Sequence, residues 1–274
     1  MLKYRVITAA VGVPLIILAI WFGKPWPWFT LLIAAAALAG TYEFYYMADL
    51  DRREPLLYLG LLLSLVLVLS PHYRNPEVLP IIITVTMLIS LICLLPRPSK
   101  EKVFRNWAWT IVGALYVGWM LSYWLSLRGL TDGRNWVYLA MLTTFANDTG
   151  AFFVGRAKGK HKLAPAISPS KTWEGAIGGL ICAILAAIVI ATVLEPISLK
   201  TGALFLFEYW QIVLLGFLVS LFAQLGDLVE SLLKRNTGAK ESGNLLPGHG
   251  GILDRFDSLI FVGAVVYYYV VWVL

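Results

Sequence analysis

The chain has 274 residues, of which 59% are hydrophobic and only 14% are charged, and its mean hydropathy is +0.76. A soluble domain is usually about half apolar and about a quarter charged, so this composition excludes an ordinary soluble protein and indicates a membrane protein. The net charge of +6 does not by itself indicate nucleic-acid binding, because the basic residues are placed where they report membrane topology. Cys93 and Cys182 lie in apolar runs and support neither a disulfide framework nor a cysteine metal site.

Nine stretches are long and apolar enough to be candidates for crossing roughly 30 Å of hydrocarbon. We therefore predict an all-α, polytopic membrane protein of about nine transmembrane helices. Lys3 and Arg5 precede the first stretch as in a signal peptide, but no small-residue cleavage site follows, so we expect this span to be retained. The predicted spans are residues 6–23, 28–48, 55–70, 79–96, 107–127, 135–155, 175–195, 209–232 and 254–274.

Basic residues gather in the predicted connections on one side of the membrane. Of the 22 lysines and arginines, all but five lie at the N-terminus or in even-numbered connections. Because positively charged loops stay cytoplasmic, this asymmetry predicts an N-terminus inside and a C-terminus outside. The five exceptions are Lys24, Arg74, Arg128, Arg134 and Lys200.

Two cytoplasmic connections are long and rich in polar residues, residues 156–174 and 233–253. Both lie on the side that a soluble, charged metabolite can reach. We read residues 1–274 as a single membrane domain, in which residues 1–130 supply N-terminal helical spans and residues 131–274, with these two loops, form the catalytic half.

The eighth predicted span ends with Asp227, Glu230 and Lys234, spaced so that all three share one helix face. Acids at membrane depth cost several kcal/mol unless they are paired or hydrated, and they are candidates for function. Glu230 and Lys234 could simply pair with each other as i, i+4 neighbours. That pairing would leave Asp227 without a partner in its own helix, so Asp227 is the better candidate for a metal ligand.

A glycine-rich segment leads into the ninth predicted span. Gly248, Gly250 and Gly251 surround His249 and allow a backbone to approach a ligand closely with its N–H groups. Asp254, Arg255 and Asp257 follow at the start of a helix, where N–H groups lack intrahelical partners. For Asp257, a role as an ordinary N-terminal cap and a role as a ligand are equally acceptable. For Asp254, which is next to the glycine-rich segment and to Arg255, we favour binding of a cation that bridges to phosphate.

These acids suit magnesium, which takes few protein carboxylates and completes its shell with water and substrate phosphates. We predict that Asp227 and Asp254, from the facing ends of consecutive spans, hold one such ion. Three lysines and two arginines would neutralise the remaining charge of the phosphates. These groups suit phosphoryl or nucleotidyl transfer, in which catalysis depends mainly on positioning and on electrostatic stabilisation. The predicted cations are Lys171, Lys234, Lys240, Arg235 and Arg255, and His249 could act as acid or base or merely orient a phosphate.

The other loop reads AISPSKTWEGAIGG and is expected to form a polar turn at Ser168 to Lys171. Ser168, Lys171 and Thr172 are good phosphate donors, although an interfacial cap with a lysine at headgroup level is an equal alternative. Upstream, Asp148 lies near the cytoplasmic end of the sixth span. It is either a third acid of the site or a buried acid bonded to Asn147 or Thr149. Glu43 is left with two readings, a pairing with another helix or a place in the same cavity.

The 27 residues from Ser231 to Asp257, SLLKRNTGAKESGNLLPGHGGILDRFD, closely resemble the signature of the phosphatidate cytidylyltransferases, also called CDP-diacylglycerol synthases. Gly226-Asp227, the SPSKTWEG loop and the Asn147-Asp148 pair also look like features of that family. Two positions depart from its pattern, because Glu241 stands where the family usually has Asp and Ser170 where it usually has a basic residue.

The resemblance implies a magnesium-dependent reaction of CTP with phosphatidate that gives CDP-diacylglycerol and pyrophosphate. A phosphate oxygen of phosphatidate would attack the α-phosphorus of CTP in line, with Asp227 and Asp254 on the metal. A phosphate monoester is already an anionic nucleophile, so no strong general base such as His249 is required. The family also favours a homodimer, and the sequence leaves open whether a second, monovalent cation joins the magnesium.

Other CTP-using lipid enzymes, such as a polyprenol kinase or a CDP-archaeol-type synthase, would have similar acids and basic loops. A secondary transporter is less favoured, because no internal repeat is visible and the acids gather at one membrane face instead of the midplane. The size of the chain favours a bacterial inner membrane, with the active site facing the cytoplasm. The expected partners are CTP, phosphatidate and the bilayer, and no nucleic acid.

Overall fold

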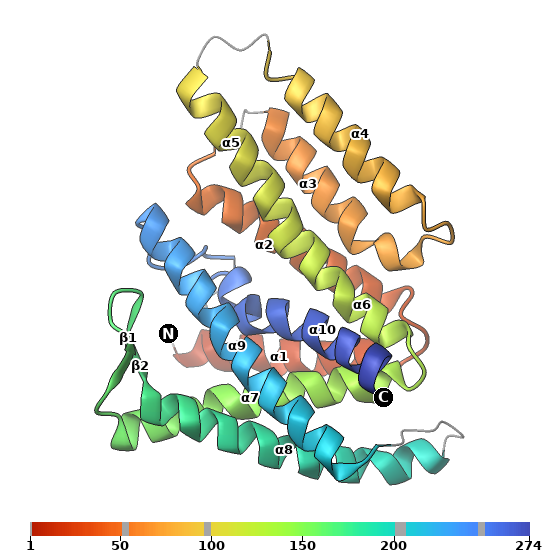
Figure 1. Cartoon of the computed structure of the whole chain (residues 1–274), viewed down its shortest axis with the longest axis vertical. Coiled ribbons are helices and arrows are strands. Elements are labelled where there is room, and N and C mark those ends of the chain that lie inside the picture. The colour runs from red at the N-terminus through yellow and green to blue at the C-terminus, as the bar shows by residue number, and fades with distance from the viewer. Residues whose placement is uncertain (1, 51–54, 96–99, 201–206, 246–249) are drawn as a thin grey trace. The chain divides into compact units, whose positions relative to one another are not determined.

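The computed structural model describes residues 2–50, 55–95, 100–200, 207–245 and 250–274, and these residues are mostly helical (Figure 1). They fall into two compact units, unit 1 (Met1–Ala19, Trp26–Leu125, Ala239–Asp254) and unit 2 (Ile20–Pro25, Ser126–Gly238, Arg255–Leu274). The elements are α1 (Leu2–Trp21), α2 (Trp28–Met47), α3 (Pro55–Val68), η1 (Ser70–His72), α4 (Val78–Ile92), α5 (Lys100–Gly113), η2 (Ala114–Trp119), α6 (Met120–Gly129), α7 (Gly133–Lys158), β1 (Lys162–Ala164), β2 (Ser168–Thr172), α8 (Trp173–Lys200), α9 (Tyr209–Thr237) and α10 (Leu253–Val273).

The helices confirm an all-α membrane protein but do not support the count of nine spans. Within the described residues, five helices are long and apolar enough to cross a membrane: Trp28–Met47, Val103–Gly129, Trp173–Pro196, Tyr209–Thr237 and Leu253–Val273. Three more apolar helices are shorter, Gly12–Trp21, Pro55–Val68 and Val78–Ile92. A 14-residue helix such as α3 spans only about 21 Å. The predicted sixth span corresponds to α7, whose charged and amide side chains lower its hydropathy.

One side of α8 has the exposed apolar surface that is expected of a helix in contact with lipid. Five large apolar side chains recur every four residues along this helix and are each 54–60% exposed. Such a continuous apolar stripe is unusual on a soluble protein, whereas it is the normal lipid-facing side of a membrane helix. The residues are Ile177, Ile181, Leu185, Val189 and Val193.

Unit 1 packs α2, α3 and α5 together with η2, a stretch of π-helix that continues α5 into α6. Tyr45 is fully buried among these helices, and its hydroxyl donates a 2.6 Å hydrogen bond to the carbonyl of Thr110. The hydroxyls of Thr41 and Ser64 lie 2.7 Å apart and join α2 to α3. Polar side chains thus satisfy one another inside an otherwise apolar packing, as hydrogen bonding in lipid requires.

Unit 2 packs α7 along α8, and α9 lies against both helices. Small residues permit the close approach of α7 and α8: a Cβ atom at Gly150 would lie 2.6 Å from Cβ of Cys182, and one at Gly178 would lie 2.5 Å from Cβ of Val154. Small residues at helix contacts are typical of membrane proteins, because the backbones can then come into contact.

The predicted loop 156–174 is instead mostly regular structure. α7 continues to Lys158, and β1 and β2 form an antiparallel hairpin that leads directly into α8 (Figure 1). The prediction of a polar turn at Ser168 to Lys171 was wrong, because these residues form strand β2 and the chain turns at residues 165–167. Pro165 fixes the backbone torsion that such a turn needs.

The second predicted loop is also shorter than expected. α9 continues to Thr237 and ends at Gly238, whose φ of +73° gives the left-handed conformation that commonly terminates helices. Residues 239–245 and 250–252 then connect α9 to α10. Two residues of the predicted site, Gly248 and His249, lie outside the described residues.

Candidate active site

Three carboxylates of unit 2 form a cluster at the meeting of α9 and α10. One carboxylate oxygen from each of Asp227, Glu230 and Asp257 lies within 4.8 Å of the others. Asp227 and Glu230 are one turn apart on α9, and Asp257 lies in the second turn of α10. Of the two readings of Asp257, a cap or a member of the acidic site, the cluster favours the second.

Gly226 explains how the two helices bring these acids together. A Cβ atom at this position would lie 2.6 Å from the backbone oxygen of Asp257 and 3.3 Å from Cα of Ser258. Any larger residue would therefore push the backbone of α10 away from α9. Glycine at residue 226 permits the close approach that places Asp257 beside Asp227.

Two lysines neutralise part of this negative charge. Lys171 on β2 places its Nζ 2.7 Å from Oδ2 of Asp227, and Lys234 places its Nζ 2.5 Å from Oε2 of Glu230. The i, i+4 pairing of Glu230 with Lys234 was one of the two readings of the sequence, and it is the one that the structure adopts. The expectation that Asp227 has no partner in its own helix was wrong, since Ser231 donates to its Oδ1 at 3.3 Å.

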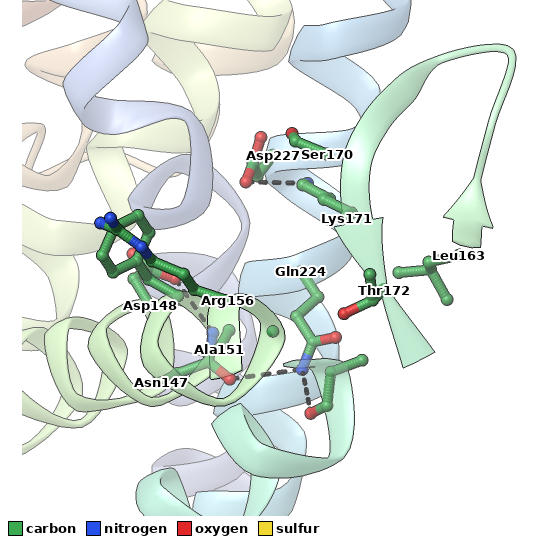
Figure 2. Close-up of a pocket in the computed structure, with 13 residues that line it drawn as sticks. Asn147, Asp148, Ala151, Arg156, Leu163, Ser170, Lys171, Thr172, Gln224 and Asp227 are labelled. Atoms are coloured by element: carbon green, nitrogen blue, oxygen red, sulfur yellow. Dashed lines mark hydrogen bonds and ion pairs between the residues drawn. The ribbon is translucent and has the colours of Figure 1, made fainter. Parts of the chain in front are cut away.

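A pocket of about 420 Å³ opens beside this cluster, between α7, the hairpin, α8 and α9 (Figure 2). Lys171 and Asp227 form one wall, and Asp148 and Arg156 come from α7. The pocket therefore combines two acids with two cations, a suitable lining for a metal and an anionic ligand. Its lining residues are Asn147, Asp148, Ala151, Phe152, Gly155, Arg156, Leu163, Ser170, Lys171, Thr172, Ala176, Gln224 and Asp227.

Amide side chains connect the helices beneath the pocket. Oδ1 of Asn147 accepts hydrogen bonds from the Ser220 hydroxyl at 2.7 Å and from Nε2 of Gln224 at 3.3 Å. Nδ2 of Asn147 donates to Asp148 at 3.0 Å, and Gln224 also donates to the carbonyl of Ala176 (Figure 2). Asp148 is bonded to Asn147 and lines the pocket, but it is exposed and therefore not the buried acid of the second reading, and its role as a third acid of the site stays a prediction.

The hairpin is anchored at both of its ends. Glu174 in the first turn of α8 accepts hydrogen bonds from the backbone N–H groups of Lys160 and His161, and its Oε1 lies 2.6 Å from Nδ1 of His161. Arg235 on α9 donates from Nε to the carbonyl of Ile167 at 3.1 Å. The position of Lys171 in the pocket is therefore determined by contacts from two helices.

Thr172 has a local structural role in addition to lining the pocket. Its Oγ1 accepts the backbone N–H of Gly175 at 3.2 Å, which is the N-cap interaction of α8. Ser168 lies on the same strand but does not line the pocket. Lys240 and Arg255 are both exposed.

In unit 1, Asp254 accepts hydrogen bonds from the residues that precede α10. Oδ2 of Asp254 accepts the backbone N–H groups of Ser242 at 3.0 Å and of Gly251 at 2.9 Å. Gly250 has a φ of +79°, which only glycine adopts easily. The N–H of Gly251 is thus engaged with Asp254, and the predicted roles of Gly250, Gly251 and Asp254 toward phosphate or metal stay predictions.

Sequence reasoning did not select Gln224 or Arg156 as site residues. Gln224 could have been found, because it precedes Asp227 by three residues and so lies on the same face of the helix. Arg156 was read only as a topological charge, since nothing in the sequence shows that α7 continues past it as far as Lys158.

The acid cluster fits a magnesium ion. Carboxylate oxygens are the hard ligands that this ion prefers, and it is usually bound through one or two of them. Asp227 and Asp257 are the better pair within the cluster, because the Glu230 side chain is fully buried and paired with Lys234, whereas Asp227, although paired with Lys171, also lines the open pocket.

Fold and site together define a helical membrane protein with a pocket that is lined by both acidic and basic side chains. A family model described as the cytidylyltransferase family matches residues 3–273, and the chain belongs to this family. The expectation of a nucleotidyltransferase is thereby confirmed.

Named relatives agree with this family. The chain is 35% identical over 272 residues to the phosphatidate cytidylyltransferase of Bacillus subtilis (strain 168), which covers 97% of both proteins. It is 38% identical over 201 residues to that of Staphylococcus aureus (strain COL), covering 73% of both. A third similarity, 45% over 165 residues to that of Staphylococcus haemolyticus (strain JCSC1435), covers 60% of this chain and 59% of the relative.

Proposed function

We propose that the protein is a phosphatidate cytidylyltransferase, which converts CTP and phosphatidate into CDP-diacylglycerol and pyrophosphate. The main observation in support is the acid cluster of α9 and α10 beside Lys171 and the pocket. The names of the relatives support the choice of CTP and phosphatidate. An apolar helical fold suits a lipid substrate, and a polar pocket suits a soluble triphosphate.

In the proposed reaction, a phosphate oxygen of phosphatidate attacks the α-phosphorus of CTP in line. The new bond joins this oxygen to the α-phosphorus, and the bond from the α-phosphorus to the bridging oxygen breaks, so that pyrophosphate leaves. The nucleophile is already anionic near neutral pH, and no side chain has to remove a proton. Catalysis then depends on positioning and on neutralising charge.

The residues of unit 2 can supply both contributions. Lys171 and Arg156 line the pocket and can bind phosphate oxygens, because charge-assisted hydrogen bonds to phosphate are strong. Asp227 orients the Lys171 ammonium across a 2.7 Å ion pair. Asp227 and Asp257 would hold magnesium, with Asp254 and Asp148 as further candidates. A bound magnesium ion would offset negative charge on the phosphates.

Topology and assembly are part of the same proposal. We place the site at the cytoplasmic face with the N-terminus inside, because most basic residues lie in connections on that side. This topology requires nine spans, so the shorter helices α1, α3 and α4 and the more polar α7 would have to cross the bilayer in addition to the five helices that are long and apolar enough. A homodimer in a bacterial inner membrane completes the proposal.

The test uses the purified chain in detergent with CTP, magnesium and phosphatidate, and it follows pyrophosphate and lipid product together. We expect metal-dependent formation of a CDP-lipid. Asp227→Asn should abolish it, whereas Glu208→Gln, at the opposite end of α9, serves as the matched control and should remain active. If phosphatidate gives no product but a polyprenol or an archaeal-type lipid phosphate does, the proposed substrate is wrong.

A further inference from the structure

Glu43 is a buried acid of α2 that the proposed mechanism does not use. Glu43 is only 2% exposed. Among the residues that the structure describes, no lysine or arginine forms an ion pair with it. A buried carboxylate without compensation is costly, so its partners must be found elsewhere.

The partners of Glu43 lie in the connection between α9 and α10 and at the first residue of α10. Oε1 accepts the backbone N–H of Ile252 at 3.0 Å, and Oε2 accepts that of Leu253 at 2.8 Å. The hydroxyl of Ser242 lies 3.2 Å from Oε2. These residues are about 200 positions from Glu43 in the chain, and all lie in unit 1. The carboxylate therefore ties α2 to the start of α10.

Ser242 connects Glu43 to Asp254. Its hydroxyl donates to Glu43 and accepts the backbone N–H of Asp254 at 3.2 Å. Its own backbone N–H donates to Oδ2 of Asp254 at 3.0 Å. Two carboxylates and one serine thus satisfy the N–H groups of residues 251–254 at the start of α10, where N–H groups lack intrahelical partners, and that of Ser242 in the connection.

Two glycines, Gly243 and Gly251, pack closely against the Glu43 carboxylate. A Cβ atom at Gly243 would lie 2.6 Å from Oε1, and one at Gly251 would lie 2.5 Å from Oε2. The glycines of this segment thus serve close packing against the carboxylate of another helix, a role that their sequence pattern alone does not reveal.

We infer that Glu43 is a positioning residue: through Ser242 and the N–H groups of Ile252 and Leu253, it holds Ser242 and residues 250–254 in the conformation that the reaction needs. The inference rests on the proposed function, because it assigns this conformation to binding of CTP and magnesium. Glu43 itself touches neither ligand in this account.

Glu43→Gln is the sharpest test, because it keeps the size of the side chain and changes its hydrogen bonding. One amide oxygen remains an acceptor, but the NH₂ group then faces a backbone N–H donor, and a buried donor without an acceptor is unfavourable. Thr41→Val is the matched control, since Thr41 is on the same helix and equally buried, and its hydroxyl bonds to Ser64 and not to this segment.

Two measurements are made on each variant: amide hydrogen exchange in peptides covering 239–245 and 250–256, and the concentrations of magnesium and of CTP that give half-maximal activity. In Glu43→Gln we expect faster exchange in these peptides and a rise of at least about fivefold in one half-saturating concentration. A loss of folded protein alone lowers the maximal rate and leaves half-saturation unchanged. Thr41→Val should match the wild type in both measurements.

Unchanged exchange, or faster exchange with wild-type half-saturation, overturns the inference. If Glu43→Gln does not fold, Ser242→Ala gives the same comparison, because it removes one donor and leaves the carboxylate in place. A wild-type protein that makes no CDP-lipid overturns the proposed function and with it the catalytic part of this inference. Unchanged exchange in an active Glu43→Gln enzyme would leave the proposed function intact and remove Glu43 alone.

Discussion

Lys171 Nζ lies 2.7 Å from Asp227 Oδ2, and this ion pair joins strand β2 to α9. Both side chains line the same pocket (Figure 2). The lysine comes from the short β1–β2 hairpin and the acid from the long apolar helix α9, so the pocket forms only when the hairpin packs against this helix. The pair gives the pocket a cation whose position is fixed before any substrate binds, as preorganised electrostatic stabilisation requires.

Replacing Lys171 by methionine should lower activity strongly. The variant removes the cation beside Asp227, so the acid cluster loses one of the two lysines that pair with it. Hydrogen bonds to charged groups contribute about 1.5–3 kcal/mol, so we expect kcat/KM for CTP to fall by at least about tenfold. Lys162→Met on β1 of the same hairpin is the control, and its activity should stay near that of the wild type. Similar activity in both variants would remove Lys171 from the mechanism.

CDP-lipid formation should depend on magnesium and on the carboxylates that are predicted to bind it. EDTA should abolish CDP-lipid formation, and added magnesium should restore it. Asp257→Asn should raise the magnesium concentration for half-maximal activity by at least about tenfold, because the cluster loses one of its two better ligands.

Asp254→Asn separates the two candidate ligand sets. An asparagine can still accept the N–H groups of Ser242 and Gly251 with its amide oxygen. If Asp254 only organises the glycine segment, this variant should keep most of the activity and the wild-type magnesium dependence. A loss as large as that of Asp257→Asn would restore the pairing of Asp227 with Asp254 that the sequence predicts.

The sequence was sufficient to predict the membrane class and the acids of α9, because composition and helical spacing report both directly. Lys171 was also selected from the sequence, and the structure places it on strand β2, in the lining of the pocket. Sequence reasoning chose Asp254 over Asp257 as a metal ligand, because Asp254 is next to the glycine-rich segment and to Arg255. Their partners differ in the structure, since Asp257 joins the α9 acids across Gly226 and Asp254 bonds to the backbone. Contacts between distant segments, such as Glu43 with Leu253, leave no periodic pattern to detect.

Gly226→Ala should weaken the packing of α9 against α10. The added methyl group would lie 2.6 Å from the backbone oxygen of Asp257, and backbone has little freedom to move aside. Overpacking of this kind typically costs about 1–3 kcal/mol, so the midpoint of thermal unfolding in detergent should fall by several degrees and activity should fall with it. Gly129→Ala is the control, because nothing lies within 4 Å of a Cβ atom there. Equal stability of the two variants would contradict the close approach.

The pairing of Glu230 with Lys234 allows structural and catalytic roles to be separated. Glu230 is 0% exposed, and its Oε2 lies 2.5 Å from Nζ of Lys234. Removing one member of a buried pair leaves an uncompensated charge and costs about 3–5 kcal/mol, whereas replacing both members by apolar residues is often neutral. Lys234→Met should therefore destabilise the protein strongly, and the double variant Glu230→Leu/Lys234→Met should regain most of the loss.

Activity of the double variant then decides what the pair contributes beyond stability. If Lys234 binds phosphate, as the sequence predicts, the double variant should be stable but at least about tenfold less active at saturating CTP. The measurement combines thermal unfolding with kcat on the same detergent preparation. A double variant that is both stable and fully active would limit Lys234 to compensating Glu230, and would leave Lys171 and Arg156 as the cations of the pocket.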